Sequence, residues 1–265
     1  MIRYFLATFC FFTIGISVQG QSNIDVLHYK YIIDLNDNND TIYGLSIIKF
    51  VNTKSSSSVE LDLTSLSAGK GMKVSDVMIL QDESPKIAYS HNNNKLLINA
   101  NLNSGDTTTL RILYMGIPAD GLIISKNKYG KRTFFADNWP DRGHNWIPCK
   151  EDPADKASVE FIVTAPQHYQ VVSNGIQIEE TNLTDNKKRT HWKEDVPIST
   201  KVMVIGVADF AVKRSGTIND CIPVYSWVYP EDRDKGFYDY AQAAEILPWF
   251  IKNVGPYAYK KLANV

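Results

Sequence analysis

The sequence predicts a mainly β protein, a sandwich or a broad antiparallel sheet, followed by a shorter segment that contains a helix. Two observations predict this class. Between Leu27 and Val207, stretches that alternate apolar and polar residues recur at short, regular spacing with turn residues between them, which is typical of antiparallel sheets. After Pro230 the alternation stops, and apolar residues recur every three or four positions, which is typical of a helix.

The turns between the expected strands have recognisable chemistry. The polar run Asn36–Asp40 and the tip His91–Asn94 are rich in residues that tolerate left-handed backbone angles, and Asn174-Gly175 is the strongest short hairpin signal in the chain. The strands expected between such turns cover 27–36, 41–52, 59–63, 72–80, 86–90, 95–101, 107–116, 122–125, 133–136, 157–164, 169–173, 176–180, 190–192 and 201–207.

One segment in the middle of the chain, 137–155, does not fit the strand pattern. Its three prolines cannot donate to the ladder of a central sheet, so we expect an ordered loop. Trp139, Trp146 and Ile147 are the apolar residues expected to pack this loop onto the sheet. Ordered loops of this size often carry function.

The C-terminal part is expected to begin a second domain near Cys221. A helix is predicted over 231–253, with acidic residues at its start where the helix dipole favours negative charge. Pro248 is expected to kink this helix or to split it in two. Gly255-Pro256 should end it, and the last nine residues resemble the entry to a further strand. The face expected to be apolar carries Phe237, Tyr240, Ala241, Ala244 and Leu247.

The N-terminus is typical of a secretory signal peptide. Arg3 supplies the positive start, Tyr4 to Val18 form an apolar run, and small residues allow cleavage after Gly20. A retained membrane anchor is the alternative, although the run is short for a span. We therefore expect an exported protein, periplasmic, cell-surface or secreted. The net charge of −1 argues against a nucleic acid as partner.

Residues that could carry chemistry are few. No two of the five histidines stand four apart in a His-Glu-x-x-His pattern, so no zinc-binding helix is predicted. We therefore expect no metal ligands in this chain. His144, in the central loop, is the histidine of most interest. Glu151, Asp152 and Asp155 are expected to make a turn with surface ion pairs to Lys150 and Lys156. The sequence also has no phosphate-binding loop and no nucleophile elbow, so we expect no catalytic residues in this chain.

Two cysteines, Cys149 and Cys221, would remain after removal of the signal peptide. An exported protein can form disulfides, but sequence alone does not place two thiols within bonding distance. We expect two buried free thiols, with a disulfide as the alternative.

Three motifs, in the right order, resemble the aminopeptidase N type of zinc metallopeptidase, peptidase family M1. The first is WIPCKEDPADKASVEFIVTAP at 146–166, which resembles an aromatic-Pro-Cys-x-Asp-Glu-Pro-x-x-Lys-Ala signature that leads into a strand. The second is YQVVSNG at 169–175, and the third is PISTKVMVIGVADF at 197–210. The segment from Ile222 onward resembles the opening of the family's catalytic domain.

This resemblance implies a large saddle-like antiparallel β domain, then a strand and a helix that open an incomplete thermolysin-like α/β domain. The expected division is a signal peptide at 1–20, the β domain at 21–220 and the start of a truncated catalytic domain at 221–265. The family's zinc ligands and catalytic groups would follow Val265. We therefore expect no cofactor in this chain, zinc in the full-length parent, and peptide substrates and the missing catalytic domain as partners. No stable membrane span is expected.

The resemblance also implies a substrate-binding site. The family's β domain contributes a Gln that helps to hold the free amino group of the substrate. Counting back from the Pro-Cys signature without gaps leads to Asp137, with Asn138 beside it. A carboxylate or an amide oxygen can accept hydrogen bonds from an ammonium group. A purely structural role, in which both residues cap the loop, is the alternative.

Two hypotheses follow. In the first, the chain is the N-terminal portion of an exported aminopeptidase and is inactive alone. In the second, it is a free-standing β module that binds peptides or a partner protein without turnover. An isolated amphipathic helix lacks a domain to pack against, so the first hypothesis predicts an exposed apolar patch around Phe237, Leu247 and Phe250.

Overall fold

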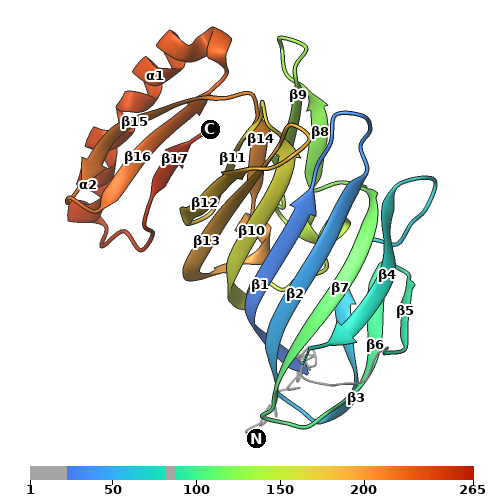
Figure 1. Ribbon diagram of the computed structural model, residues 1–265. Helices are drawn as coiled ribbons and strands as arrows, with labels where there is room; N and C mark the ends of the chain where they lie inside the picture. Colours follow the sequence, from blue (N-terminus) through green and yellow to red (C-terminus); the bar gives the residue numbers. More distant parts are fainter. Residues whose placement is uncertain (1–22, 81–86) are drawn as a thin grey trace, which may run out of the picture.

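The computed structural model describes residues 23–80 and 87–265, so the signal peptide expected at 1–20 lies outside the described residues. The mainly β class predicted from the sequence is confirmed (Figure 1). The strands of the β part are β1 (Ile24–Asp34), β2 (Ile42–Asn52), β3 (Ser56–Asp62), β4 (Gly71–Ile79), β5 (Tyr89–Asn92), β6 (Lys95–Leu102), β7 (Thr107–Ile117), β8 (Leu122–Lys126), β9 (Arg132–Ala136), β10 (Lys156–Pro166), β11 (Gln170–Ser173), β12 (Ile176–Asn182), β13 (Lys187–Ser199) and β14 (Ile205–Ala208). Two short 3-10 turns, η1 (Gly143–Asn145) and η2 (Thr200–Val202), interrupt them.

A seven-stranded sheet forms the backbone of the fold, in the order β12-β13-β10-β1-β2-β7-β4. Its neighbours are antiparallel except in the middle, where β1 runs parallel to β10. This pair joins the first strand of the described chain to one that follows the central loop. The alternation of residues along a strand does not report its direction, which is why the sequence predicted an antiparallel sheet throughout.

The core lies on one face of this sheet. Along β2 and β10 every second residue is buried, and along β1 the same alternation shifts by one residue at the irregularity between Val26 and His28, as expected for strands with one covered face. A four-stranded sheet, β11-β14-β9-β8, and a three-stranded sheet, β3-β6-β5, contribute to the same core cluster. Its largest buried side chains include Trp146, Tyr29, Tyr31, Phe50, Phe134 and Phe161.

The C-terminal unit is a small sheet with two helices on it, drawn in orange and red in Figure 1. Strands β15 (Ala211–Ile218), β16 (Ile222–Val228) and β17 (Leu262–Asn264) form the sheet, and η3 (Pro230–Asp232), α1 (Arg233–Ala241) and α2 (Ala243–Asn253) follow β16. Because β15 pairs with β16, this sheet already begins ten residues before Cys221, where the sequence placed the start of the second domain. The boundary itself stays a prediction.

Two local expectations were wrong in part or in full. The helix is split at Gln242 and not at Pro248, which lies inside α2; a kink at Pro248 stays a prediction. Asn174-Gly175 does not join two paired strands, because β11 pairs with β14 while β12 pairs with β13. Gly175 has a φ of 74°, and a Cβ there would lie 1.8 Å from the Lys193 carbonyl oxygen. The dipeptide therefore turns the chain from one sheet to another at a close backbone contact.

The apolar patch on the helices differs from the one expected. Leu247 is buried against Ile218, Ile222 and Val224 of the small sheet, and Phe237 is half-buried. Phe250 is exposed as expected, and Ile246, Trp249 and Val254 of the same segment are exposed with it. Among residues 23–80 and 87–265, no helix has the length and apolarity that crossing a membrane requires.

Candidate functional site

The segment between β9 and β10 is the ordered loop that the sequence predicted. Within this loop, Trp146, Ile147 and Cys149 are fully buried. The Trp146 ring stacks on Phe161 of β10 with 6.1 Å between the ring centroids. The expectation that Trp139 also packs the loop down was wrong, because its side chain is 61% exposed. The Lys201 ammonium lies 4.8 Å from the centre of the Trp139 ring, so this tryptophan is on the surface.

Asn138 is the polar centre of the loop. Its side chain is 1% exposed, and its Nδ2 donates to the carbonyl oxygens of Thr200 and Met203 at 3.1 and 2.7 Å. Its Oδ1 accepts a hydrogen bond from Trp146 Nε1 at 2.9 Å. One amide thus satisfies three other polar groups that the fold buries, and it joins the start of the loop to η2.

Asp137, the adjacent residue, faces the solvent. Its backbone N–H donates to the Gly121 carbonyl at 2.6 Å, while its carboxylate is 54% exposed and pairs with Arg142. Arg142 also donates to the Trp139 carbonyl oxygen at 2.6 Å and lies 3.5 Å from Asp120. The structure thus places the two predicted substrate-binding residues side by side but in opposite environments. Their roles toward a substrate stay predictions.

Glu151 forms a second polar centre beneath the loop. Its carboxylate is 9% exposed and accepts hydrogen bonds from the His144 backbone N–H at 2.8 Å, from Thr200 Oγ1 at 3.0 Å and from His144 Nδ1 at 3.1 Å. The hydrogen bond to Glu151 raises the pKa of His144 above its ordinary value, because the carboxylate favours the protonated ring. The expectation that Glu151 makes surface ion pairs was wrong.

The neighbouring carboxylates also have specific surroundings. Lys150 and Asp152 are 3.8 Å apart, as the sequence suggested. Asp155 instead accepts a hydrogen bond from the Val26 backbone N–H at 3.1 Å, which ties the end of the loop to β1. Burial raises the pKa of Asp155 to about 6. The sequence identified this cluster as a turn but could not show which carboxylate turns inward.

Cys149 and Cys221 are both free thiols, as expected. Cys149 is buried, and burial raises the pKa of its thiol well above the ordinary value, which leaves it protonated and unreactive. Cys221 is exposed rather than buried.

The donor groups do not fit a zinc ion. Zinc in proteins takes at least three protein ligands in catalytic sites and four in structural sites. Within the part of the chain that the structure describes, no three His, Cys, Asp or Glu side chains are grouped to hold a metal. No catalytic step is therefore assigned to a metal bound by these residues.

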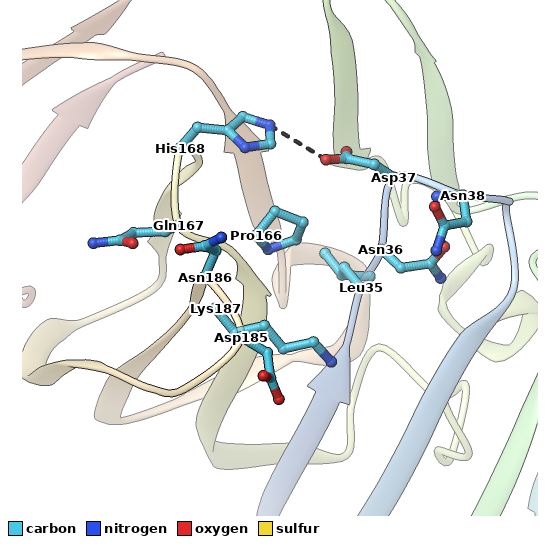
Figure 2. Close-up of a pocket in the computed structure, with 10 residues that line it drawn as sticks. All are labelled: Leu35, Asn36, Asp37, Asn38, Pro166, Gln167, His168, Asp185, Asn186 and Lys187. Atoms are coloured by element: carbon cyan, nitrogen blue, oxygen red, sulfur yellow. Dashed lines mark hydrogen bonds and ion pairs between the residues drawn. The ribbon is translucent and has the colours of Figure 1, made fainter.

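A wide opening of about 650 Å³ lies where β1, β10 and β13 meet their turns (Figure 2). Asp37 lies 3.5 Å from His168 Nε2 across it, and the Lys187 ammonium pairs with Asp34 at 3.2 Å. Asp37 also accepts a hydrogen bond from the Tyr169 hydroxyl. The charged groups that line this opening are Asp37, Asp185 and Lys187, with His168 as a further ionisable side chain.

Comparison with known proteins places this architecture in context. Residues 26–202 match the Peptidase M1 N-terminal domain. Glutamyl aminopeptidase from Homo sapiens is 29% identical over 115 residues, which are 43% of this chain and 12% of that protein. Aminopeptidase A from Gloydius brevicauda is 32% identical over 84 residues, 31% of this chain and 9% of that protein. The chain thus matches about a tenth of the length of these relatives.

Solved structures share the fold. The M1 zinc metallopeptidase from Deinococcus radiodurans has a TM-score of 0.74 at 20% identity, over 92% of this chain and 56% of that one. A mutant of that enzyme crystallised with a Tyr-Ser-Ala substrate has a TM-score of 0.72 at 17% identity, over 91% of this chain and 56% of that one. The likeness extends beyond β14 into the C-terminal unit, since it covers nearly the whole chain.

Proposed function

This chain belongs to the peptidase M1 family, and from that premise we propose that it is the N-terminal portion of an exported zinc aminopeptidase. In this proposal the parent enzyme removes N-terminal residues from peptides, and the present chain shapes one wall of the substrate cleft. The match to the family's N-terminal domain over 26–202 is the observation that carries the proposal. Export is supported by the apolar N-terminal run that follows Arg3.

The zinc ion and the groups that activate water would come from polypeptide beyond these 265 residues. The absence of a His-Glu-x-x-His pattern from the sequence supports this division of labour. Zinc in such a parent would supply the activated water. The contribution of this chain would be to bind and orient the peptide.

Asp137 is the group proposed to accept hydrogen bonds from the free amino group of the substrate. A carboxylate has two oxygens with about four acceptor positions, and Arg142 pairs with one of these oxygens. The Asn138 network fixes the backbone beside it. We propose that Asn138 supports substrate binding indirectly, by holding Asp137 in place. The polar atoms of its own side chain are already hydrogen-bonded within the protein.

The first experiment measures metal and turnover. The purified chain is expected to retain no stoichiometric zinc and to release no amino acid from aminoacyl-chromogenic substrates. Metal-dependent turnover by the pure chain, removed by a chelator and restored by zinc, would contradict the proposal.

A second experiment tests the role of Asp137 without requiring turnover. Backbone NMR spectra are recorded while phenylalanine amide is added, and N-acetylphenylalanine amide serves as the probe without a free amine. Shifts at Asp137 and Arg142 are expected with the free amine alone. Asp137→Asn should reduce them, whereas Asp141→Asn, at an exposed position in the same loop, should not. Equal shifts with the acetylated probe would remove Asp137 from the proposed role.

A further inference from the structure

A cavity of about 340 Å³ lies between the large β part and the C-terminal unit. Phe135 of β9 lines it from the β part, and the end of β16, η3 and α1 line it from the C-terminal unit; Figure 1 labels β9, β16 and α1. Ligand sites often lie where two units meet, and their volumes begin at about 300 Å³. The cavity is therefore large enough for a small molecule.

Aromatic side chains form much of its wall. The ring of Phe210, which follows β14, lies edge-to-face with those of Phe135 and Trp227, with centroids 6.0 and 5.9 Å apart. It also stacks on Tyr229 at 6.0 Å. Together with Tyr240 of α1, these residues line the cavity, which is called the aromatic pocket. Because Phe210 contacts three of the other rings, most of this wall is formed before a ligand binds.

The charged side chains that line the aromatic pocket are carboxylates. Among the described residues they are Asp232 and Asp239, and no lysine, arginine or histidine lines it. Asp232 is already paired, because the Lys128 ammonium lies 2.8 Å from it and the Tyr129 hydroxyl donates to it at 2.7 Å. Asp239 is exposed and has no ion pair or hydrogen bond within the described part of the chain. One carboxylate beside the rings is thus without a partner in this structure.

The cations around the aromatic pocket mostly have carboxylates of their own. Lys131 lies between Asp209 and Glu231, at 2.8 and 2.7 Å. Arg233, at the start of α1, pairs with Asp234 at 3.3 Å. These groups balance one another and leave the charge of Asp239 unmatched.

Lys235 is the cation closest to Asp239 along α1, one helical turn before it. Hydrogen bonds from Lys128 and Tyr129 lower the pKa of Asp232, and Lys235 adds to this effect at longer range. Lys235 does not line the aromatic pocket. A ligand in the pocket therefore meets the carboxylates before it meets a cation.

We propose that the aromatic pocket binds a small organic ammonium ion, that is, an amine with an aromatic or aliphatic body. The rings cover the apolar body and attract the ammonium group through their electron-rich faces. Asp239 supplies the anionic partner that accepts hydrogen bonds from the ammonium group.

An anion of the same shape fits less well. It would meet Asp232 and Asp239 without a cation in the wall, which is unfavourable. The indole N–H of Trp227, a donor suited to an anion, is buried and does not lie at the pocket surface. Asp137 does not line the pocket, so this assignment does not depend on the proposed peptidase function.

The test compares three probes of nearly equal shape on the purified chain: 4-phenylbutylamine, which is a cation at pH 7, 4-phenylbutanol, which is neutral, and 4-phenylbutanoate, which is an anion. Backbone NMR titrations give both the affinity and the position of each probe. The amine is expected to shift the amides of Gly236 and Tyr240 and to bind at least about tenfold more tightly than the butanoate.

A charge variant of the pocket tests the role of Asp239. Asp239→Asn should weaken binding of the amine by about threefold, the size of an exposed ion pair, and leave binding of the alcohol unchanged. Asp234→Asn is the matched control, because Asp234 is an exposed carboxylate of the same helix that does not line the pocket. It should not change the affinity for any probe.

A second variant is expected to improve binding, so a loss of folding cannot imitate its effect. Lys128→Ala removes the ammonium that pairs with Asp232 and is 64% exposed. The amine should then bind about twofold more tightly, and the alcohol should bind as before.

The carboxyl group of Val265 is the remaining anion near the aromatic pocket. Val265 lines the pocket, and its main-chain oxygen accepts a hydrogen bond from the Tyr240 hydroxyl at 3.3 Å. A chain extended by Gly-Ser-Gly after Val265 carries no carboxylate at this position. It is expected to bind the amine with unchanged affinity, because Asp239 is the proposed partner.

Several results would overturn the proposal. These are the absence of a saturable shift with the amine, equal affinity for the amine and the butanoate, and an affinity for the amine that Asp239→Asn leaves unchanged. Weaker binding of the amine to Lys128→Ala would also count against it. Loss of binding in the extended chain would assign the effect to the carboxyl group of Val265.

Discussion

The central loop and the C-terminal helices differ in how regular and how well buried they are. The loop at 137–155 has only one short turn of 3-10 helix, yet Trp146, Ile147 and Cys149 within it are fully buried. The helices α1 and α2 are regular, yet Leu247 is the only buried residue within the two helices. We infer that buried contacts, more than regular backbone geometry, decide which part of this molecule is rigid.

The polar groups of the two regions show the same difference. In the loop, the Asn138 amide and the Glu151 carboxylate are each bonded to groups on separate segments of the chain. On the helices, Trp249 and Phe250 contact each other, with ring centres 5.2 Å apart, and both remain exposed. A loop built in this way can hold Asp137 in one place, which the proposed role in substrate binding requires.

The largest effect is expected from Trp146→Ala. This change removes a fully buried side chain, its stacking on Phe161 and its hydrogen bond to Asn138. The free energy of unfolding should fall by about 3–5 kcal/mol, as measured by urea denaturation. Trp139→Ala in the same loop is the matched control, and it should change stability by less than about 1 kcal/mol because its side chain is mostly exposed. Equal losses would show that the loop is not held by its buried face.

A smaller, pH-dependent effect is expected where the C-terminal unit meets the large sheet. The Lys261 ammonium donates to the Ser173 carbonyl at 2.7 Å and lies 4.8 Å from the Trp192 ring centre. Burial lowers the pKa of Lys261 from 10.5 to about 8, although Glu194 opposes the shift. Between those values the folded chain has released a proton that the unfolded chain still binds, so stability contributed by this group rises with pH.

Lys261→Met should abolish this rise, which amounts to at most about 3 kcal/mol. The measurement compares unfolding free energies at pH 7.5 and pH 10 in the two proteins. Lys260→Met is the control, because Lys260 is exposed and pairs with Asp195 on the surface. If Lys260→Met removed the pH dependence as fully as Lys261→Met, the buried lysine would not be its source.

The smallest effect is expected on the exposed helix face. Trp249→Ala should change the free energy of unfolding by no more than about 0.5 kcal/mol, since the side chain is 59% exposed. A loss above about 2 kcal/mol would mean that α2 is held in place by contacts of this ring, and the contrast between the two regions would weaken. Thermal and urea unfolding of the same variant provide the check.

The sequence predicted features that depend on local patterns. Alternation identified most strands, Asn93 and Asn94 occupy the left-handed region as the expected hairpin tip, and the prolines marked the loop. It did not predict the parallel pairing of β1 with β10 or the separation of β11 and β12 into different sheets. Those depend on contacts between segments far apart in the chain, which local alternation does not encode.

Asp137 and Asn138 were proposed as site residues from their distance to the Pro-Cys signature, and their role toward a substrate stays a prediction. The sequence did not predict the contacts that these residues and their neighbours make. The sequence did not indicate that Arg142 pairs with Asp137, because an arginine five positions away forms such a pair only if the loop folds back on itself. Likewise, the charge run around Glu151 suggested a solvated turn, and only the position of Thr200 and His144 shows why this carboxylate turns inward.

Native-state hydrogen exchange tests most directly the claim that the irregular loop is more rigid than the regular helices. The backbone N–H of Cys149 is bonded to the Asp62 carbonyl, and those of Trp146 and Ile147 to the Gly143 carbonyl. We predict that these three amides exchange more slowly than the amides of residues 249–253 in α2. Slower exchange in α2 than at Trp146, Ile147 and Cys149 would contradict the account.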